Sequence, residues 1–187
     1  MSMIGKKVGD FAVQAYHDGE FVTVTREDLL GTWSVLVFYP ADFTFVCPTE
    51  LGDLADHYAA FQQIGCQVYS VSTDTHYVHQ QWHERSGIVG KVTYPMLADP
   101  AHVLARDFDV LIEADGVAER GSFVIDPHGE IVAYEVTSGA VGRNARELLR
   151  RVEACQYVAR HTGEVCPANW EPGRSTLEPT ITLVGQL

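Results

Sequence analysis

The chain has 187 residues, enough for one domain with a substantial core. An apolar content of 46% indicates a globular protein, and a formal charge of −12 argues against nucleic acid or an anionic membrane as a partner. No uncharged apolar stretch reaches the ~20 residues that span a bilayer. The start of the sequence also lacks the long apolar run that is typical of a secretory signal. We therefore expect a cytoplasmic protein with no membrane partner.

The expected elements alternate between strands and helices. An Asp-Gly turn between short apolar runs predicts a β-hairpin in residues 8–25. Apolar and helical patterns predict the remaining elements: strands at residues 33–39, 67–71 and 91–97, a hairpin of residues 122–125 and 131–136, and helices at residues 49–64, 75–86, 101–108 and 144–159. This order predicts an α/β protein with a thioredoxin-like fold, in which a central mixed β-sheet is flanked by helices on both faces.

The last part of the chain has a different composition. Pro167, Pro172 and Pro179 recur at short intervals, and a helix cannot continue through them. We therefore expect one domain of residues 1–160 and a C-terminal arm of residues 161–187. The apolar residues 181–184 would be exposed on a free tail, so we expect them to pack against another surface.

The stretch around Cys47 carries the strongest chemical signal. The predicted strand 33–39 ends at Pro40, while Pro48 and Glu50 suit the first turn of a helix, so Cys47 is expected at a helix N-terminus. Unpaired N–H groups and the helix dipole favour the thiolate, which is the nucleophilic form of cysteine.

Two neighbours strengthen this interpretation. The Thr44 hydroxyl could meet the sulfur or a bound oxygen, since Thr44 lies one turn back if the helix begins just before Cys47. Pro40 can shield the sulfur from water without offering a competing N–H donor. Most cysteines are inert core residues, but prolines on both sides of Thr-x-x-Cys reverse that expectation here.

These residues resemble a known family. Pro40, Thr44 and Cys47 match the Pro-x-x-x-Thr-x-x-Cys fingerprint of the peroxiredoxins. The segment Val-Cys-Pro-Ala-x-Trp around Cys166 is similar to the resolving-cysteine segment of the typical two-cysteine class, and most closely to that of bacterial alkyl hydroperoxide reductase C subunits. The likeness extends over nearly the whole chain.

The resemblance implies a thiol-specific peroxidase that needs no metal or organic cofactor. The Cys47 thiolate would reduce hydrogen peroxide or an organic hydroperoxide and become a sulfenic acid, which Cys166 would convert to an intersubunit disulfide. An external reductant, either a flavoprotein disulfide reductase or a thioredoxin-like protein, would reopen the disulfide. The resemblance also implies a head-to-tail homodimer and a ring of five dimers.

Four further residues receive roles from the resemblance. Arg120 matches an arginine beside the reactive sulfur, although without the resemblance a solvated loop arginine is the favoured interpretation. Arg143 matches a second arginine near the site, held through Glu50, and Trp82 matches a residue that borders the site.

Several alternatives remain open. His76, His79 and His83 fall at helical spacing and could bind a metal, but a solvated or interface helix is the simpler interpretation. Cys66 and Cys155 are expected to be inert core thiols. The rival functions are a one-cysteine peroxidase that an external thiol resolves, and a redox-switched chaperone or peroxide-sensing oligomer.

Overall fold

The computed structural model describes residues 2–186 and separates the chain into two compact units. The first extends to Ala145 and the second begins at Arg146. The last long helix, α4 (Ala145–Arg160), is therefore grouped with the arm, whereas the composition alone suggests a boundary at residue 160.

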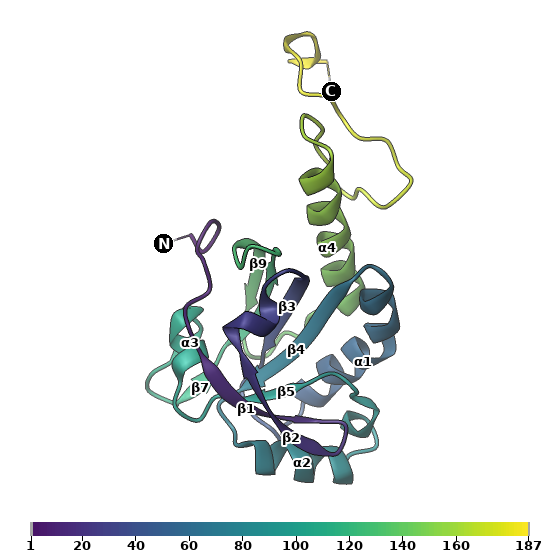
Figure 1. The fold of residues 1–187 in the computed structure, drawn as a ribbon. Coiled ribbons are helices and arrows are strands. Elements are labelled where there is room, and N and C mark those ends of the chain that lie inside the picture. The colour runs from purple at the N-terminus through teal and green to yellow at the C-terminus, as the bar shows by residue number, and fades with distance from the viewer. Residues whose placement is uncertain (1, 187) are drawn as a thin grey trace. The chain divides into compact units, whose positions relative to one another are not determined.

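A seven-stranded sheet forms the centre of the first unit (Figure 1). Its strand order is β2-β1-β5-β4-β3-β8-β9, with parallel pairing of β3 with β4 and of β4 with β5, and antiparallel pairing elsewhere. The sheet is therefore mixed, as predicted. Its strands are β1 (Ala12–His17), β2 (Glu20–Thr25), β3 (Trp33–Phe38), β4 (Cys66–Ser72), β5 (Met96–Ala98), β8 (Arg120–Ile125) and β9 (Ile131–Thr137).

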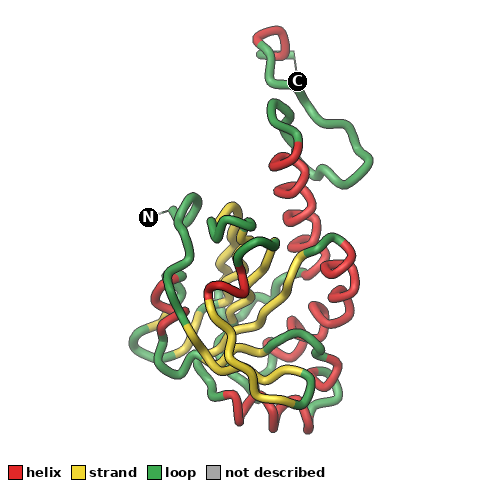
Figure 2. Tube along the Cα trace, viewed as in Figure 1, coloured by secondary structure: helices red, strands yellow, loops and turns green. Residues whose placement is uncertain are grey.

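Helices and short connections surround these strands (Figure 2). They are α1 (Cys47–Gln63), α2 (His76–Arg85), α3 (Val103–Asp107) and two 3-10 turns at Arg26–Leu29 and Val89–Lys91. Of the strand expected at 91–97, only Met96 and Leu97 belong to β5, because Lys91 is in the 3-10 turn and residues 92–95 form an irregular connection. The helix expected from residue 101 begins later, because His102 has a left-handed backbone with φ of 59°. The short hairpin of β6 (Leu111–Ile112) and β7 (Val117–Ala118) was not predicted.

Both faces of the central strand β3 are covered. Leu36 and Phe38 belong to the main apolar cluster with Leu104 of α3 and Phe108, the residue that follows this helix. Successive side chains of a strand point to opposite faces, so the buried Val35 and Val37 face the other side of the sheet. Because the side chains on both faces are buried, β3 is a continuous apolar run in the sequence, which is typical of a strand covered on both sides.

The second unit contains α4 and the arm. An isolated β-bridge joins Val165 to Leu177, and the buried indole of Trp170 donates a hydrogen bond to the carbonyl of Arg174 at 3.1 Å. A 3-10 turn at Ile181–Leu183 follows, where Ile181 is 87% exposed. Ile181 and Val184, at the apolar end of the arm, are therefore largely exposed among the described residues. Among residues 2–186, no helix has the length and apolar character needed to cross a membrane.

Candidate active site

The end of β3 and the start of α1 position Cys47. The helix begins at Cys47 itself, so Pro48 is its second residue, not its first as expected. Glu50 lies in the first turn, and Cys47 is fully buried. Thr44 therefore precedes the helix and lies in the loop between β3 and α1.

Arg120, the first residue of β8, contacts the sulfur directly. Its Nη1 lies 3.3 Å from Sγ of Cys47 and 2.7 Å from Oε2 of Glu50, while its Nε donates to the carbonyl of Gly139 at 2.8 Å. Only 4% of Arg120 is exposed. Burial alone would lower the pKa of this guanidinium, but Cys47 and Glu50 outweigh burial and raise the pKa above its ordinary value. The residue is therefore a fixed cation against the sulfur, not a solvated loop arginine.

Glu50 holds a second arginine in place. Its Oε1 accepts hydrogen bonds from the backbone N–H and Nε of Arg143, both at 2.8 Å. The same guanidinium donates to Oγ of Ser122 and to the carbonyl of Phe38. Burial would raise the pKa of Glu50, but the hydrogen bonds and charge of Arg143, with the charge of Arg120, lower it below its ordinary value.

The buried charges around the sulfur do not cancel. Glu50 supplies one negative charge, and the side chains of Arg120 and Arg143 supply two positive charges at 4% and 6% exposure. An unbalanced buried charge is costly. A thiolate on Cys47 would neutralise the group, so the arrangement is suited to a cysteine that acts as an anion.

The loop that precedes Cys47 has a constrained backbone. Pro40 follows β3 and is half-buried, and Phe43 has a left-handed φ of 55°. The Thr44 hydroxyl donates to the carbonyl of Ala41 at 2.8 Å, so its lone pairs remain able to accept from a bound peroxide.

Trp82 packs against this loop. Its ring centroid lies 6.2 Å from that of Tyr39 and 5.9 Å from that of Phe43. Trp82 comes from α2 and is almost fully buried, so it forms an aromatic wall between that helix and the loop.

The sequence did not reveal a buried polar network beneath the same loop. The carboxylate of Asp42 accepts from the Tyr39 hydroxyl at 2.7 Å and lies 2.7 Å from Nδ1 of His79. The backbone N–H of Asp42 donates to Asp74, which also accepts from Ser72. Burial, followed by the charge of Asp42, raises the pKa of Tyr39 well above its ordinary value. Since Asp42 and His79 come from distant parts of the chain, no local pattern joins them.

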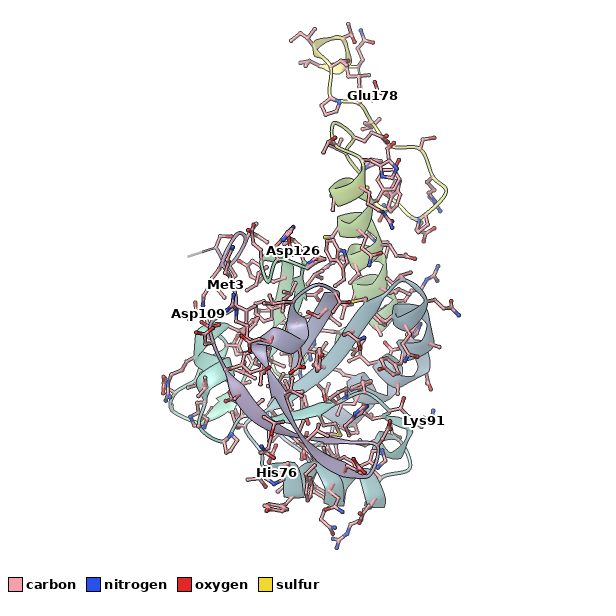
Figure 3. The ribbon with its side chains drawn as sticks, in the orientation of Figure 1. Met3, His76, Lys91, Asp109, Asp126 and Glu178 are labelled. Carbon is pink, nitrogen blue, oxygen red and sulfur yellow. The ribbon has the colours of Figure 1, made fainter. Side chains whose placement is uncertain are left out.

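The three histidines of α2 have separate environments, and His76, which Figure 3 labels, is the first residue of this helix. The ring of His76 packs on Phe21, His83 bonds the carbonyl of Val92, and His79 is fully buried. The expectation of a solvated or interface face is therefore wrong for His79. In the described part of the chain, no group of three or more His, Cys, Asp or Glu side chains is arranged to hold a metal ion.

The other cysteines differ in burial. Cys66 is 1% exposed, and burial raises its pKa to about 12, so it has the character of a core thiol. Cys155 is only partly buried, which is at odds with the inert core position expected for it. Cys166 is also partly buried and belongs to the second unit, whereas Cys47 belongs to the first.

Comparison with known proteins identifies the family. The model described as "AhpC/TSA family" matches residues 4–134. The chain belongs to the AhpC/TSA family. A second model, "C-terminal domain of 1-Cys peroxiredoxin", matches residues 154–184, a range that contains both Cys155 and Cys166.

Individual members of the family match over the full length. Alkyl hydroperoxide reductase C of Bacillus subtilis is 54% identical and that of Escherichia coli (strain K12) is 53% identical, each over 187 residues and 100% of both chains. A crystal structure of Enterococcus faecalis AhpC superposes with a TM-score of 0.87 at 56% identity, covering 89% of this chain and 100% of that chain. Reduced 2-Cys peroxiredoxin of Plasmodium vivax has a TM-score of 0.91 at 32% identity, covering 96% and 95%. These similarities confirm the peroxiredoxin resemblance and the thioredoxin-like fold that the order of strands and helices predicts.

Proposed function

We propose that this protein is a thiol-specific peroxidase that reduces hydrogen peroxide and organic hydroperoxides through Cys47. The contact that carries the proposal is Nη1 of Arg120 at 3.3 Å from Sγ of Cys47, in a buried group with one excess positive charge. The full-length similarity to proteins named alkyl hydroperoxide reductase C supports the same substrate class.

The first step uses the charge distribution of the site. The Cys47 thiolate attacks one peroxide oxygen, the O–O bond breaks, and the leaving oxygen takes a proton and departs as water or an alcohol. Cys47 becomes a sulfenic acid. Arg120 stabilises the charge that develops on the oxygens, Thr44 and Pro40 position and shield the peroxide, and Glu50 and Arg143 keep Arg120 in place. Trp82 holds the loop from the α2 side.

The second step uses Cys166. Its thiolate attacks the sulfenic sulfur, a disulfide forms, and hydroxide leaves as water. We assign Cys166 to the partner subunit of a homodimer. An external dithiol, from a flavoprotein disulfide reductase or a thioredoxin-like protein, then returns both cysteines to thiols. The cycle needs a reducing compartment, which agrees with a cytoplasmic location.

An edge strand of the sheet supports a dimer. β9 is the last strand of the seven-stranded sheet, and its Tyr134 and Val136 are 37% and 41% exposed. An exposed edge strand with apolar side chains is a template for pairing with another chain. We propose that two subunits associate and that five dimers form a ring.

The test oxidises reduced protein with one equivalent of hydrogen peroxide, blocks free thiols, and maps linked peptides after a non-reducing denaturing gel. We expect a covalent dimer that joins Cys47 to Cys166, which Cys47→Ser and Cys166→Ser each abolish. Folded protein with Cys47 still a free thiol would contradict the proposed function.

The rival functions predict different kinetics. If the protein is a one-cysteine peroxidase, the Cys166→Ser variant still reduces peroxide continuously with the native reductant. In the proposed cycle, the same variant stops after Cys47 is oxidised. A sensor or redox-switched chaperone reacts once and then stops even in the wild type. Steady-state peroxide consumption with a thioredoxin system or a flavoprotein reductase separates the three.

A further inference from the structure

Cys155 and Cys166 are neighbours within the second unit. Sγ of Cys166 lies 4.0 Å from the carbonyl oxygen of Ala154, the residue before Cys155 on α4. Covalent geometry places that oxygen ~3 Å from Cα of the next residue, so the Cys166 sulfur lies within ~7 Å of Cα of Cys155. The two cysteines are therefore neighbours within the second unit, and a disulfide between them requires the arm to bring the Cα atom of Cys166 to the usual ~4.4–6.8 Å from that of Cys155.

The electrostatics agree with this proximity. Burial, and then the charge that Cys166 would carry, raise the pKa of Cys155, while Arg151 opposes both. Burial and Glu164 raise the pKa of Cys166, while Arg150 opposes them. An arginine of α4 therefore lowers the pKa of each thiol, and the charge of Cys166 acts on Cys155. Both thiols are only partly buried.

We propose that Cys155 and Cys166 form a second redox pair, which receives the disulfide from Cys47. This inference rests on the proposed peroxidase cycle. In the chain that supplies Cys166, the Cys155 thiolate attacks the Cys166 sulfur of the Cys47–Cys166 disulfide. The old S–S bond breaks, a Cys155–Cys166 bond forms within one chain, and Cys47 leaves as a thiolate. The numbers of electrons and disulfides do not change, so no further oxidant is needed.

The charges of the two sites set the direction of this exchange. A disulfide is a stronger oxidant when its reduced, thiolate form is better stabilised, so at equilibrium the free thiolate is favoured at the cysteine that stabilises it better. The Cys47 thiolate is stabilised by Arg120 at 3.3 Å and by the start of α1. Cys155 has a raised pKa and no such stabilisation at a helix N-terminus. The disulfide should therefore move away from Cys47 and into the arm.

The exchange has two measurable consequences. It breaks the covalent link between subunits, because the new disulfide lies within one chain. It also returns Cys47 to its reactive form before any reductant arrives, so each chain can reduce a second peroxide. Without reductant, we expect consumption of about two equivalents of peroxide per chain in the wild type and about one in Cys155→Ala.

The first experiment follows the disulfides over time. Wild type, Cys155→Ala and the matched control Cys66→Ala are oxidised with one equivalent of hydrogen peroxide, quenched at intervals, and analysed on non-reducing gels with peptide mapping. We expect the covalent dimer of the wild type and of Cys66→Ala to decay to a monomer with linked Cys155 and Cys166, while Cys155→Ala remains a dimer. A wild-type dimer as persistent as that of Cys155→Ala overturns the relay.

The second experiment tests the pair independently of the peroxidase. The Cys47→Ser protein is treated with the thiol oxidant diamide, which takes up the two hydrogens that disulfide formation releases. We expect a monomer that carries the Cys155–Cys166 disulfide. If that disulfide is absent while the wild type still forms the Cys47–Cys166 dimer, the inference fails and the proposed function stands. If the disulfide forms in Cys47→Ser but wild-type Cys47 does not react with peroxide, the proposed function fails separately.

Discussion

Asp42 and His79 form a fully buried pair, with Oδ2 of the carboxylate 2.7 Å from Nδ1 of the imidazole, although they lie 37 positions apart. The other ring nitrogen, Nε2, lies 3.1 Å from the carbonyl oxygen of Leu97. These two contacts of the His79 ring tie the loop before Cys47 to α2 and β5.

His79→Gln removes the imidazole that lies within hydrogen-bond distance of Asp42 and of the carbonyl of Leu97. A buried polar group that loses its partner typically costs ~1–3 kcal/mol, so we expect a loss of stability of that order. Urea unfolding measures it, and amide hydrogen exchange in residues 42–46 should speed up more than in β3. His83→Gln is the matched control, because His83 is on the same helix and is only partly buried. Equal effects of the two substitutions would contradict a special role for the pair.

Arg120→Gln should slow the reaction of Cys47 with hydrogen peroxide by ~10²–10³, since one preorganised donor to the reacting atoms is lost. Arg120→Lys keeps a positive charge but lacks the planar guanidinium that reaches both Cys47 and Glu50. Its rate should therefore lie between that of the wild type and that of Arg120→Gln. Stopped-flow measurement of Cys47 oxidation gives the rates, and circular dichroism confirms folding. Arg106→Gln, which removes an exposed ion pair with Glu113, should leave the rate unchanged. A folded Arg120→Gln with the wild-type rate would exclude Arg120 from the reaction.

Glu50 should make the stability of the protein depend on pH in the acid range. Its pKa is lower in the folded state than its ordinary value of 4.5, so the folded state binds the proton less readily. The stabilisation is therefore fully present above that value and is lost as pH falls through the lower folded pKa. Glu50→Gln should be less stable at pH 7, and its stability should change less than that of the wild type between pH 5 and about 3. Parallel curves for the two proteins in urea unfolding would contradict this linkage.

Cys66 should not react with iodoacetamide in the native protein at pH 8, because burial raises its pKa to about 12 and covers its sulfur. Cys166 in the same sample is partly buried and should be modified, which makes it an internal control. Quantitative peptide mapping before and after unfolding in urea gives both results. Modification of native Cys66 as fast as that of Cys166 would show that its side of the sheet opens.

The same burial has a consequence at high pH. The pKa of Cys66 is raised above its ordinary value of 9.0, so its contribution to stability is fully present below that value. It is lost as pH rises toward about 12. Cys66→Ala should remove this part of the alkaline destabilisation, which urea unfolding between pH 8 and 10 can measure as a shallower slope than in the wild type.

The sequence by itself determined the features that depend on neighbouring residues. Apolar runs and turn signals located the main strands and long helices, because pleated and helical faces have characteristic periods. Pro48 and Glu50 located the start of α1 near Cys47, and the fingerprint of Pro40, Thr44 and Cys47 identified the family. These patterns are local, so one sequence is sufficient to read them.

Only the tertiary structure decided which distant groups share one environment. The contact of Arg120 with Cys47 spans 73 positions, and the Asp42–His79 pair depends on the packing of α2 against the loop before α1. The environment of Cys155 likewise depends on the return of the arm to α4 at Ala154. Burial, desolvation and charge balance are properties of packed neighbours, and no period along the chain reports them.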